Sequence, residues 1–167
     1  MTLAGCSSAE SPPPNPFEAE FERAKRQASS EFEHAVLEDS TISRAEYQES
    51  IDRFLRCMND NGIEATALPA RNGTFTYRWP KAQGNDDTES KCRVGTTMHI
   101  EPLYIEIVVN PKNEDRFELM VRCLARESLV PPGYTTDDLQ KDMSSGYANA
   151  PFDHNSTKVM DCMSGPA

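Results

Sequence analysis

Apolar residues recur every three or four positions in the first stretch of the chain that can fold. The positions are Phe17, Phe21, Ala24, Ala28, Phe32 and Val36. This spacing places them on one face of a helix and leaves charged residues on the other face. Asn15 is a preferred residue before a first helical turn, and Pro16 suits the first position of that turn. The pattern predicts one amphipathic helix from about residue 16 to 38.

A second helical stripe follows a short break at residues 39–42. Ser43 and Glu46 have the spacing of a capping box, in which the two side chains satisfy backbone N–H groups of the first turn. The apolar positions of this stripe are Tyr47, Ile51, Phe54, Leu55 and Met58. Gly62 favours a left-handed stop after the last turn. The sequence therefore predicts a second long helix.

Residues 63–79 change to the alternation of apolar and polar residues that is typical of strands. Asn72-Gly73 is a turn signal, and Phe75, Tyr77 and Trp79 alternate after it. We expect a small β-hairpin near 63–79. Residues 80–91 are polar and contain proline and glycine, so we expect them to form an exposed loop.

Two interpretations are open for residues 100–110. Alternate apolar residues, such as Leu103, Ile105 and Ile107, suit a strand. The helical template fits at every step, because the apolar residues follow the three- and four-residue spacing of one helix face: Ile100, Leu103, Tyr104, Ile107 and Val108. Pro102 is tolerated in a first helical turn, where its missing N–H would have no partner. We favour a helix near 98–109.

The rest of the chain is mainly helical. We expect a helix near 114–127, a short helix from Thr136, irregular structure over 144–156 and a last helical turn near 158–163. The predicted fold is α+β and mainly α. It consists of two long N-terminal helices, later helices near 98–109 and 114–127, and a small hairpin near 63–79.

Composition restricts the possible partners. The chain has 17 Lys and Arg against 27 Asp and Glu, a formal charge of −10. An acidic surface repels phosphate backbones, so we expect no nucleic-acid partner. No run approaches the roughly 18 consecutive apolar residues of a membrane-spanning helix. Any attachment to a membrane would therefore be covalent.

The N-terminus contains a short motif with a chemical meaning. Leu3-Ala4-Gly5-Cys6 resembles the bacterial lipobox, in which the cysteine carries diacylglycerol and becomes the mature N-terminus. The resemblance implies that Cys6 is acylated, with chains such as palmitate, and that residues before it belong to a signal peptide. Met1 would then lie inside that signal peptide.

Residues 7–16 are polar and rich in proline, with nothing to bury. Such a segment favours an extended spacer between an anchor and a folded body. We therefore expect a lipobox remnant and tether over 1–16 and one globular domain over 17–163. The lipid on Cys6 would hold the domain at the outer face of the cell membrane. Secretion, or a cytoplasmic location if the lipobox match is chance, is the alternative.

Four further cysteines, Cys57, Cys92, Cys123 and Cys162, lie at wide spacings. Their spacing does not suit a zinc or thioredoxin-like site, and outside the cytoplasm they favour two structural disulfides. Four cysteines allow three pairings. We favour Cys57–Cys92 and Cys123–Cys162, because these bonds would hold the hairpin and the C-terminal segment against helices. The crossed pairing, Cys57–Cys123 with Cys92–Cys162, stays open.

No known catalytic, metal-binding or cofactor-binding motif occurs in the chain, so we expect no metal, no cofactor and no enzymatic activity. The three histidines, His34, His99 and His154, are far apart in sequence. Glu101 and Glu106 could form a general acid/base pair. The aromatic residues Tyr77, Trp79 and Tyr104 could line a small ligand groove, although a place in the core suits them better.

Several segments together resemble a group of uncharacterised lipoproteins and secreted proteins of actinobacteria. The resemblance lies in Ser43-Arg44-Ala45-Glu46-Tyr47 through Cys57-Met58, Cys92-x-x-Gly95-Thr96, Glu101-Pro102-Leu103-Tyr104, Asn110-Pro111, Cys123-Leu124 and Val130-Pro131-Pro132-Gly133-Tyr134-Thr135. It covers most of residues 30–162 and implies four cysteines of a common framework, with no assigned activity. We expect a monomeric, non-catalytic surface module that binds a cell-envelope protein or a cell-wall ligand. The alternative is a small extracytoplasmic hydrolase with a carboxylate-based site.

Overall fold

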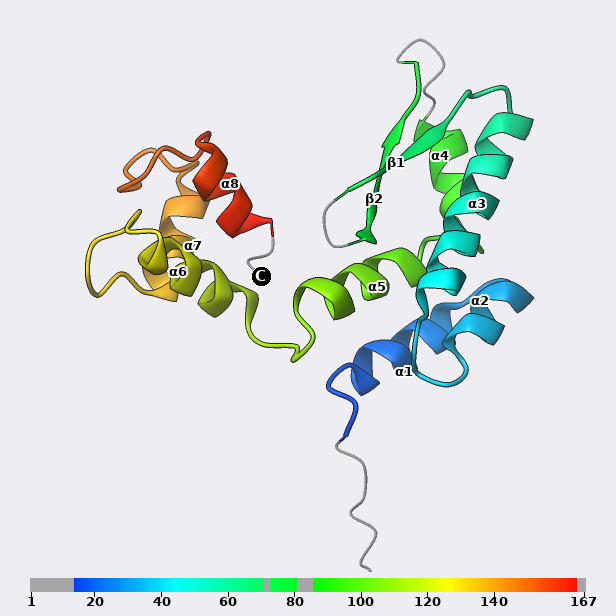
Figure 1. Cartoon of the computed structure of the whole chain (residues 1–167), viewed down its shortest axis with the longest axis horizontal. Coiled ribbons are helices and arrows are strands. Elements are labelled where there is room, and N and C mark those ends of the chain that lie inside the picture. Colours follow the sequence, from blue (N-terminus) through cyan, green and yellow to red (C-terminus); the bar gives the residue numbers. More distant parts are fainter. Residues whose placement is uncertain (1–13, 71–72, 81–85, 165–167) are drawn as a thin grey trace, which may run out of the picture.

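The computed structural model of the chain describes residues 14–70, 73–80 and 86–164. The predicted fold class is confirmed, because helices dominate and the single sheet of the described residues is a two-stranded antiparallel hairpin (Figure 1). The elements in chain order are α1 (Glu18–Gln27), α2 (Glu31–Leu37), α3 (Arg44–Asp60), β1 (Thr66–Pro69), β2 (Phe75–Arg78), α4 (Asp86–Arg93), α5 (Ile100–Val109), α6 (Arg116–Arg126), α7 (Thr136–Ser144) and α8 (Thr157–Met163).

The single helix predicted over 16–38 is wrong, because the chain breaks into α1 and α2. Ala28 leaves the helical conformation with a ψ of 136°. The Ser30 hydroxyl accepts a hydrogen bond from the Glu33 N–H, and the Glu33 carboxylate accepts one from the Ser29 N–H. Serine side chains offer the backbone partners that compete with a continuous helix, and here they start a new one.

Helix α3 begins as predicted, with the capping box of Ser43 and Glu46. Its buried face includes Tyr47, Ile51 and Phe54, all fully covered. The predicted helix over 98–109 is confirmed as α5, so the strand interpretation is excluded. Helix α5 packs against α1, α2 and α3, and the Tyr104 ring stacks on the Tyr47 ring with centroids 4.1 Å apart. These helices enclose the first core.

The predicted hairpin is confirmed, with Ala67 opposite Tyr77 in the register of β1 and β2. The exposed loop predicted over 80–91 is partly wrong, because helix α4 begins at Asp86. Polar residues fill most of this helix, so apolar periodicity does not reveal it. The Cys57–Cys92 disulfide joins α4 to α3, as the favoured pairing predicts. Cys92, Phe54 and Met58 form the centre of a second, adjacent core.

The C-terminal helices have a core of their own. Helices α6, α7 and α8 gather beside one another and apart from α1–α5 (Figure 1). Leu124, Leu139 and Val159 are almost completely buried there. The favoured Cys123–Cys162 disulfide is present and links α6 to α8. Between α7 and α8 the chain is irregular, as predicted.

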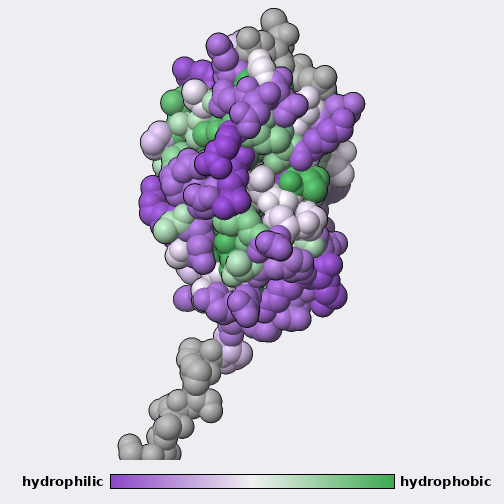
Figure 2. Space-filling model, turned by 90° about the vertical axis from the view of Figure 1, so that its right-hand side faces the viewer, coloured by the Kyte–Doolittle hydropathy of each residue, from purple (hydrophilic) through white to green (hydrophobic). Residues whose placement is uncertain are grey.

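One face of the molecule is drawn in Figure 2, and it is predominantly hydrophilic. Figure 2 shows the side of the molecule that lies on the right in Figure 1, where small apolar areas are interrupted by hydrophilic residues. The apolar stripes of α1, α3 and α5 supply buried residues of the first core. Among the described residues, no helix combines the length and the apolar character needed to cross a bilayer.

Candidate functional site

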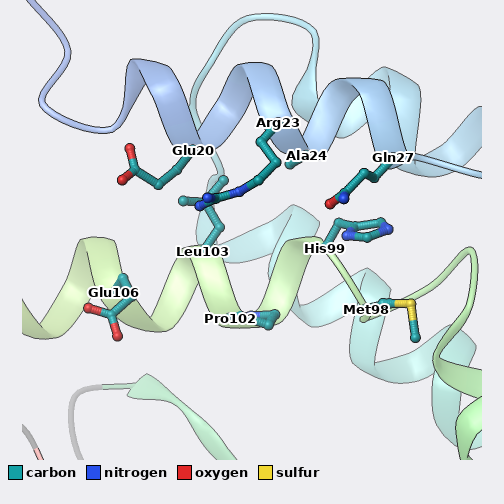
Figure 3. A pocket seen from close by; sticks show the side chains of 9 residues that line it. All are labelled: Glu20, Arg23, Ala24, Gln27, Met98, His99, Pro102, Leu103 and Glu106. Atoms are coloured by element: carbon teal, nitrogen blue, oxygen red, sulfur yellow. The ribbon is translucent and has the colours of Figure 1, made fainter.

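An open groove of about 200 Å³ lies between helices α1 and α5 (Figure 3). Its lining residues are Glu20, Arg23, Ala24, Gln27, Met98, His99, Pro102, Leu103 and Glu106. Two helix faces therefore meet here, one from each wall. The groove combines apolar surface with charged and amide side chains, as small-ligand sites commonly do.

The local sequence explains the two walls. Glu20, Arg23, Ala24 and Gln27 follow the three- and four-residue spacing of a single face of α1. On the opposite side, the groove-lining residues extend from the segment before α5 into its second turn. Pro102 occupies the first turn of α5, where its lack of an N–H has no cost. One wall is therefore regular helix, and the other is the turn of Met98 and His99 followed by the first two turns of α5.

The floor of the groove is apolar. Ala24 and Leu103 are each 7% exposed and belong to the first core. Pro102 and Met98 extend this apolar surface toward solvent, and Met98 is 41% exposed. The small side chain of Ala24 leaves room between the helices, which creates the depression.

The acidic side chains at one end of the groove have partners. Glu106 forms an ion pair of 2.5 Å with Arg116, at the start of α6. Glu20 Oε1 accepts a hydrogen bond of 3.4 Å from the Asn113 amide, which also donates to the Pro16 carbonyl oxygen at 2.8 Å. Glu20 therefore contacts the connection between α5 and α6, and Glu106 contacts the first residue of α6.

The other three polar side chains of the groove, Arg23, Gln27 and His99, have no hydrogen-bond or ion-pair partner in the described part of the chain. Figure 3 shows that Gln27 and His99 lie close to one another on opposite walls, while Arg23 extends along the groove from α1 toward Leu103. Each of the three can donate a hydrogen bond.

A buried polar network lies on the other side of α5. Glu101 is 6% exposed and accepts hydrogen bonds from Tyr77 at 2.7 Å, Tyr47 at 3.3 Å and Arg93 at 3.1 Å. Arg93 also pairs with Glu89. The network connects α3, β2, α4 and α5 through one carboxylate.

The environment keeps the two tyrosines and the arginine of this network in their ordinary charge states. Burial, and then the negative charge of Glu101, raise the pKa of Tyr77 and of Tyr47. Burial alone would lower the pKa of Arg93, but hydrogen bonding to Glu89 and the charge of Glu101 raise it. The tyrosines stay neutral donors and the guanidinium stays charged, which suits a structural link rather than proton transfer.

Of the aromatic residues proposed for a ligand groove, Tyr104 is buried, and Tyr77 and Trp79 are partly buried. Tyr77 binds Glu101, Tyr104 is 7% exposed and stacks on Tyr47, and Trp79 packs against the second core. None of the three lines the α1–α5 groove. The two carboxylates suggested as an acid/base pair lie in different sites. Glu101 belongs to the buried network, and Glu106 lines the groove.

The histidines lie in three different surroundings. His99 lines the groove, His34 lies beside Lys25 and Glu38 in a shallow depression, and His154 stacks on Tyr147 with ring centroids 5.1 Å apart. Among the described residues, no three acidic, histidine or cysteine side chains are grouped as metal ligands would be. Cys6 lies outside the described residues.

The sequence pattern did not indicate Arg23 and Gln27 as site residues. The available signal was weak: two polar residues four positions apart, beside the small Ala24 on the apolar stripe. No pattern along the chain indicates that this edge of α1 lies against the start of α5.

Comparisons with known protein families, with curated proteins and with solved structures found no match for this chain.

Proposed function

We propose that this protein is a non-catalytic binding module of the bacterial cell envelope, anchored through a lipid on Cys6 at the outer face of the cell membrane. The observation that carries the binding role is the open α1–α5 groove, whose donors Arg23, Gln27 and His99 have no partner among the described residues. Polar groups without partners beside an apolar floor are suited to a ligand that supplies acceptors.

Two features support a location outside the cytoplasm. Both disulfides join cysteines that are far apart in sequence, with separations of 35 and 39 residues, and such bonds persist in oxidising compartments. The lipobox-like Leu3-Ala4-Gly5-Cys6 precedes a proline-rich spacer. Together these features favour an exported chain that is tethered rather than released.

A carboxylate-based hydrolase is the second candidate, because Glu20 and Glu106 both line the groove. A general base must be free to accept a proton from the substrate or from water. Glu106 instead pairs with Arg116, and Glu20 accepts from Asn113. Ligand binding therefore fits the groove better than hydrolysis.

The anchor is tested with a precursor that carries a complete signal peptide, expressed in an actinobacterial host. The wild-type protein is expected to enter the detergent phase of a Triton X-114 extraction, and Cys6→Ser to stay in the aqueous phase. Wild-type protein recovered from the cytosol without a lipid on Cys6 would exclude the proposed location.

The binding role is tested with isotope-labelled full chain carrying Cys6→Ser, mixed with solubilised cell-envelope extract. Amide chemical shifts are expected to change along α1 and at the start of α5, and to stay constant along α7. If envelope material leaves the groove residues unperturbed at every concentration, the groove is not the binding site.

A further inference from the structure

The unpartnered groups of the α1–α5 groove indicate the chemistry of its ligand. Arg23 offers only donors, and Gln27 and His99 each offer at least one. The two carboxylates of the same groove have partners elsewhere: Glu20 accepts from Asn113 in the α5–α6 connection, and Glu106 pairs with Arg116 at the start of α6. Arg23, which can only donate, therefore has no acceptor among the described residues, and a ligand group with several acceptor atoms would complement it.

The lack of a partner for Arg23 is informative in so acidic a chain. The formal charge is −10, and Glu20 lies three residues before Arg23 on the same helix, within reach of an ordinary ion pair. Glu20 faces Asn113 instead. A carboxylate of the ligand would supply the ion-pair partner that Arg23 lacks, because a guanidinium binds a planar carboxylate through two parallel hydrogen bonds.

The size of the groove limits how much of a ligand it can hold. At about 200 Å³ it is smaller than the roughly 300–1,000 Å³ of sites that enclose a whole drug-sized molecule. Its floor of Ala24, Leu103 and Pro102 can cover one apolar side chain, and its open side lets a chain continue into solvent. The end of a longer molecule fits these conditions.

We propose that the α1–α5 groove binds the free C-terminal carboxylate of a peptide whose last residue is apolar. The carboxylate binds Arg23, with Gln27 and His99 as further donors. The last side chain covers Ala24 and Leu103. Glu20 and Glu106, at the acidic end, repel a second negative charge and so orient the terminus. Recognition of a free carboxylate end is a general mode of peptide binding. The inference rests on the proposed binding function and specifies its ligand.

The test uses the full chain with Cys6→Ser and the probe N-acetyl-Gly-Gly-Leu with a free carboxylate. Isothermal titration calorimetry compares this peptide with the same peptide ending in a carboxamide. Loss of the charged hydrogen bonds is expected to weaken binding about tenfold or more. Arg23→Gln is expected to cause a similar loss for the free acid and little change for the amide.

Arg26→Gln is the matched control. Arg26 is exposed on the same helix, outside the groove, so this variant removes the same charge and is expected to bind the free acid as the parent does. Circular dichroism melting of both variants checks that the fold is retained. Equal losses for Arg23→Gln and Arg26→Gln would mean that only the general charge of α1 matters, which overturns the inference.

The other outcomes separate the ligand assignment from the proposed function. Equal affinity for the acid and the amide would overturn recognition of a carboxylate. N-acetyl-leucine binding as tightly as the tripeptide would overturn the peptide assignment, since the remaining chain would then contribute nothing. If envelope extract perturbs the groove residues and the tripeptide does not, only the ligand assignment fails. If neither perturbs them, the binding function fails as well.

Discussion

A single buried carboxylate, Glu101, connects four elements of the N-terminal part of the molecule. Its oxygens accept from Tyr47 and Tyr77 and pair with Arg93, whose guanidinium lies over the rings of Phe54 and Tyr77 at 5.0 and 5.4 Å. A charge in such a position is stable only while its partners remain, because a charged or polar group left unpaired in the interior is costly.

We therefore expect Glu101→Ala to destabilise the protein by about 2–4 kcal/mol, as the loss of one member of a buried network does. Glu106→Ala on the same helix is the matched control. It removes an ion pair with Arg116 that is half-exposed, and such pairs contribute about 0–1 kcal/mol. Urea denaturation followed by circular dichroism measures both. Similar losses for the two variants would show that Glu101 is not a structural centre.

At the scale of elements, the turn before α5 holds α2 in place. The Ser30 hydroxyl, which caps α2, also donates to the Gly95 carbonyl oxygen at 2.7 Å. Gly95 has a φ of +74°, and a Cβ there would lie 3.2 Å from the Ser30 Cβ. The turn thus requires both a left-handed backbone and the absence of a side chain.

Gly95→Ala is expected to cost more than Gly62→Ala. Gly62 has a similar φ of +79° with nothing within 4 Å of an added Cβ, so its substitution has only the left-handed cost of about 1–2 kcal/mol. Gly95→Ala adds the close contact with Ser30 and should exceed the control by about 1 kcal/mol. Thermal unfolding of the two variants measures the difference. Equal midpoints would mean that α2 moves away without cost.

The sequence predicts those elements in which apolar spacing and a terminal signal agree. Ser43 and Glu46 mark the start of α3, and the apolar stripe of residues 100–108 indicates α5. Prediction from the sequence fails where a polar side chain decides the local conformation. The break at Ser30 lies inside a continuous apolar stripe, and α4 has almost no stripe.

The sequence predicts less of the candidate site than of the fold, for a physical reason. Periodicity identifies which face of α1 is buried, but Arg23 and Gln27 lie at the edge of that face. Their role depends on His99 and Pro102, more than 70 residues later in the chain. Such neighbours are created by the packing of α1 on α5, which no local pattern encodes.

On the scale of the whole molecule, the described residues divide between two sets of cores. Helices α1–α5 and the hairpin surround the first two, and α6–α8 surround the third. Each disulfide lies within one part. The contacts around residues 110–116, including the ion pair of Glu106 with Arg116, connect the two parts. This arrangement predicts that the two parts can unfold separately.

The α6–α8 part is small, and a core of that size is marginal without a covalent link. Closing a loop of 39 residues stabilises by roughly 3–4 kcal/mol in the chain-entropy model. The double variant Cys123→Ala/Cys162→Ala is therefore expected to unfold α6–α8 while α1–α5 stay folded. Hydrogen exchange measured by mass spectrometry should show fast exchange at Leu124 and Leu139 and continued protection at Ile51 and Phe54.

The double variant Cys57→Ala/Cys92→Ala, which opens a loop of 35 residues, is the matched control and should leave α6–α8 protected. If Cys123→Ala/Cys162→Ala instead exposes both parts together, residues 17–163 unfold as one cooperative domain and the division into two parts is only geometric.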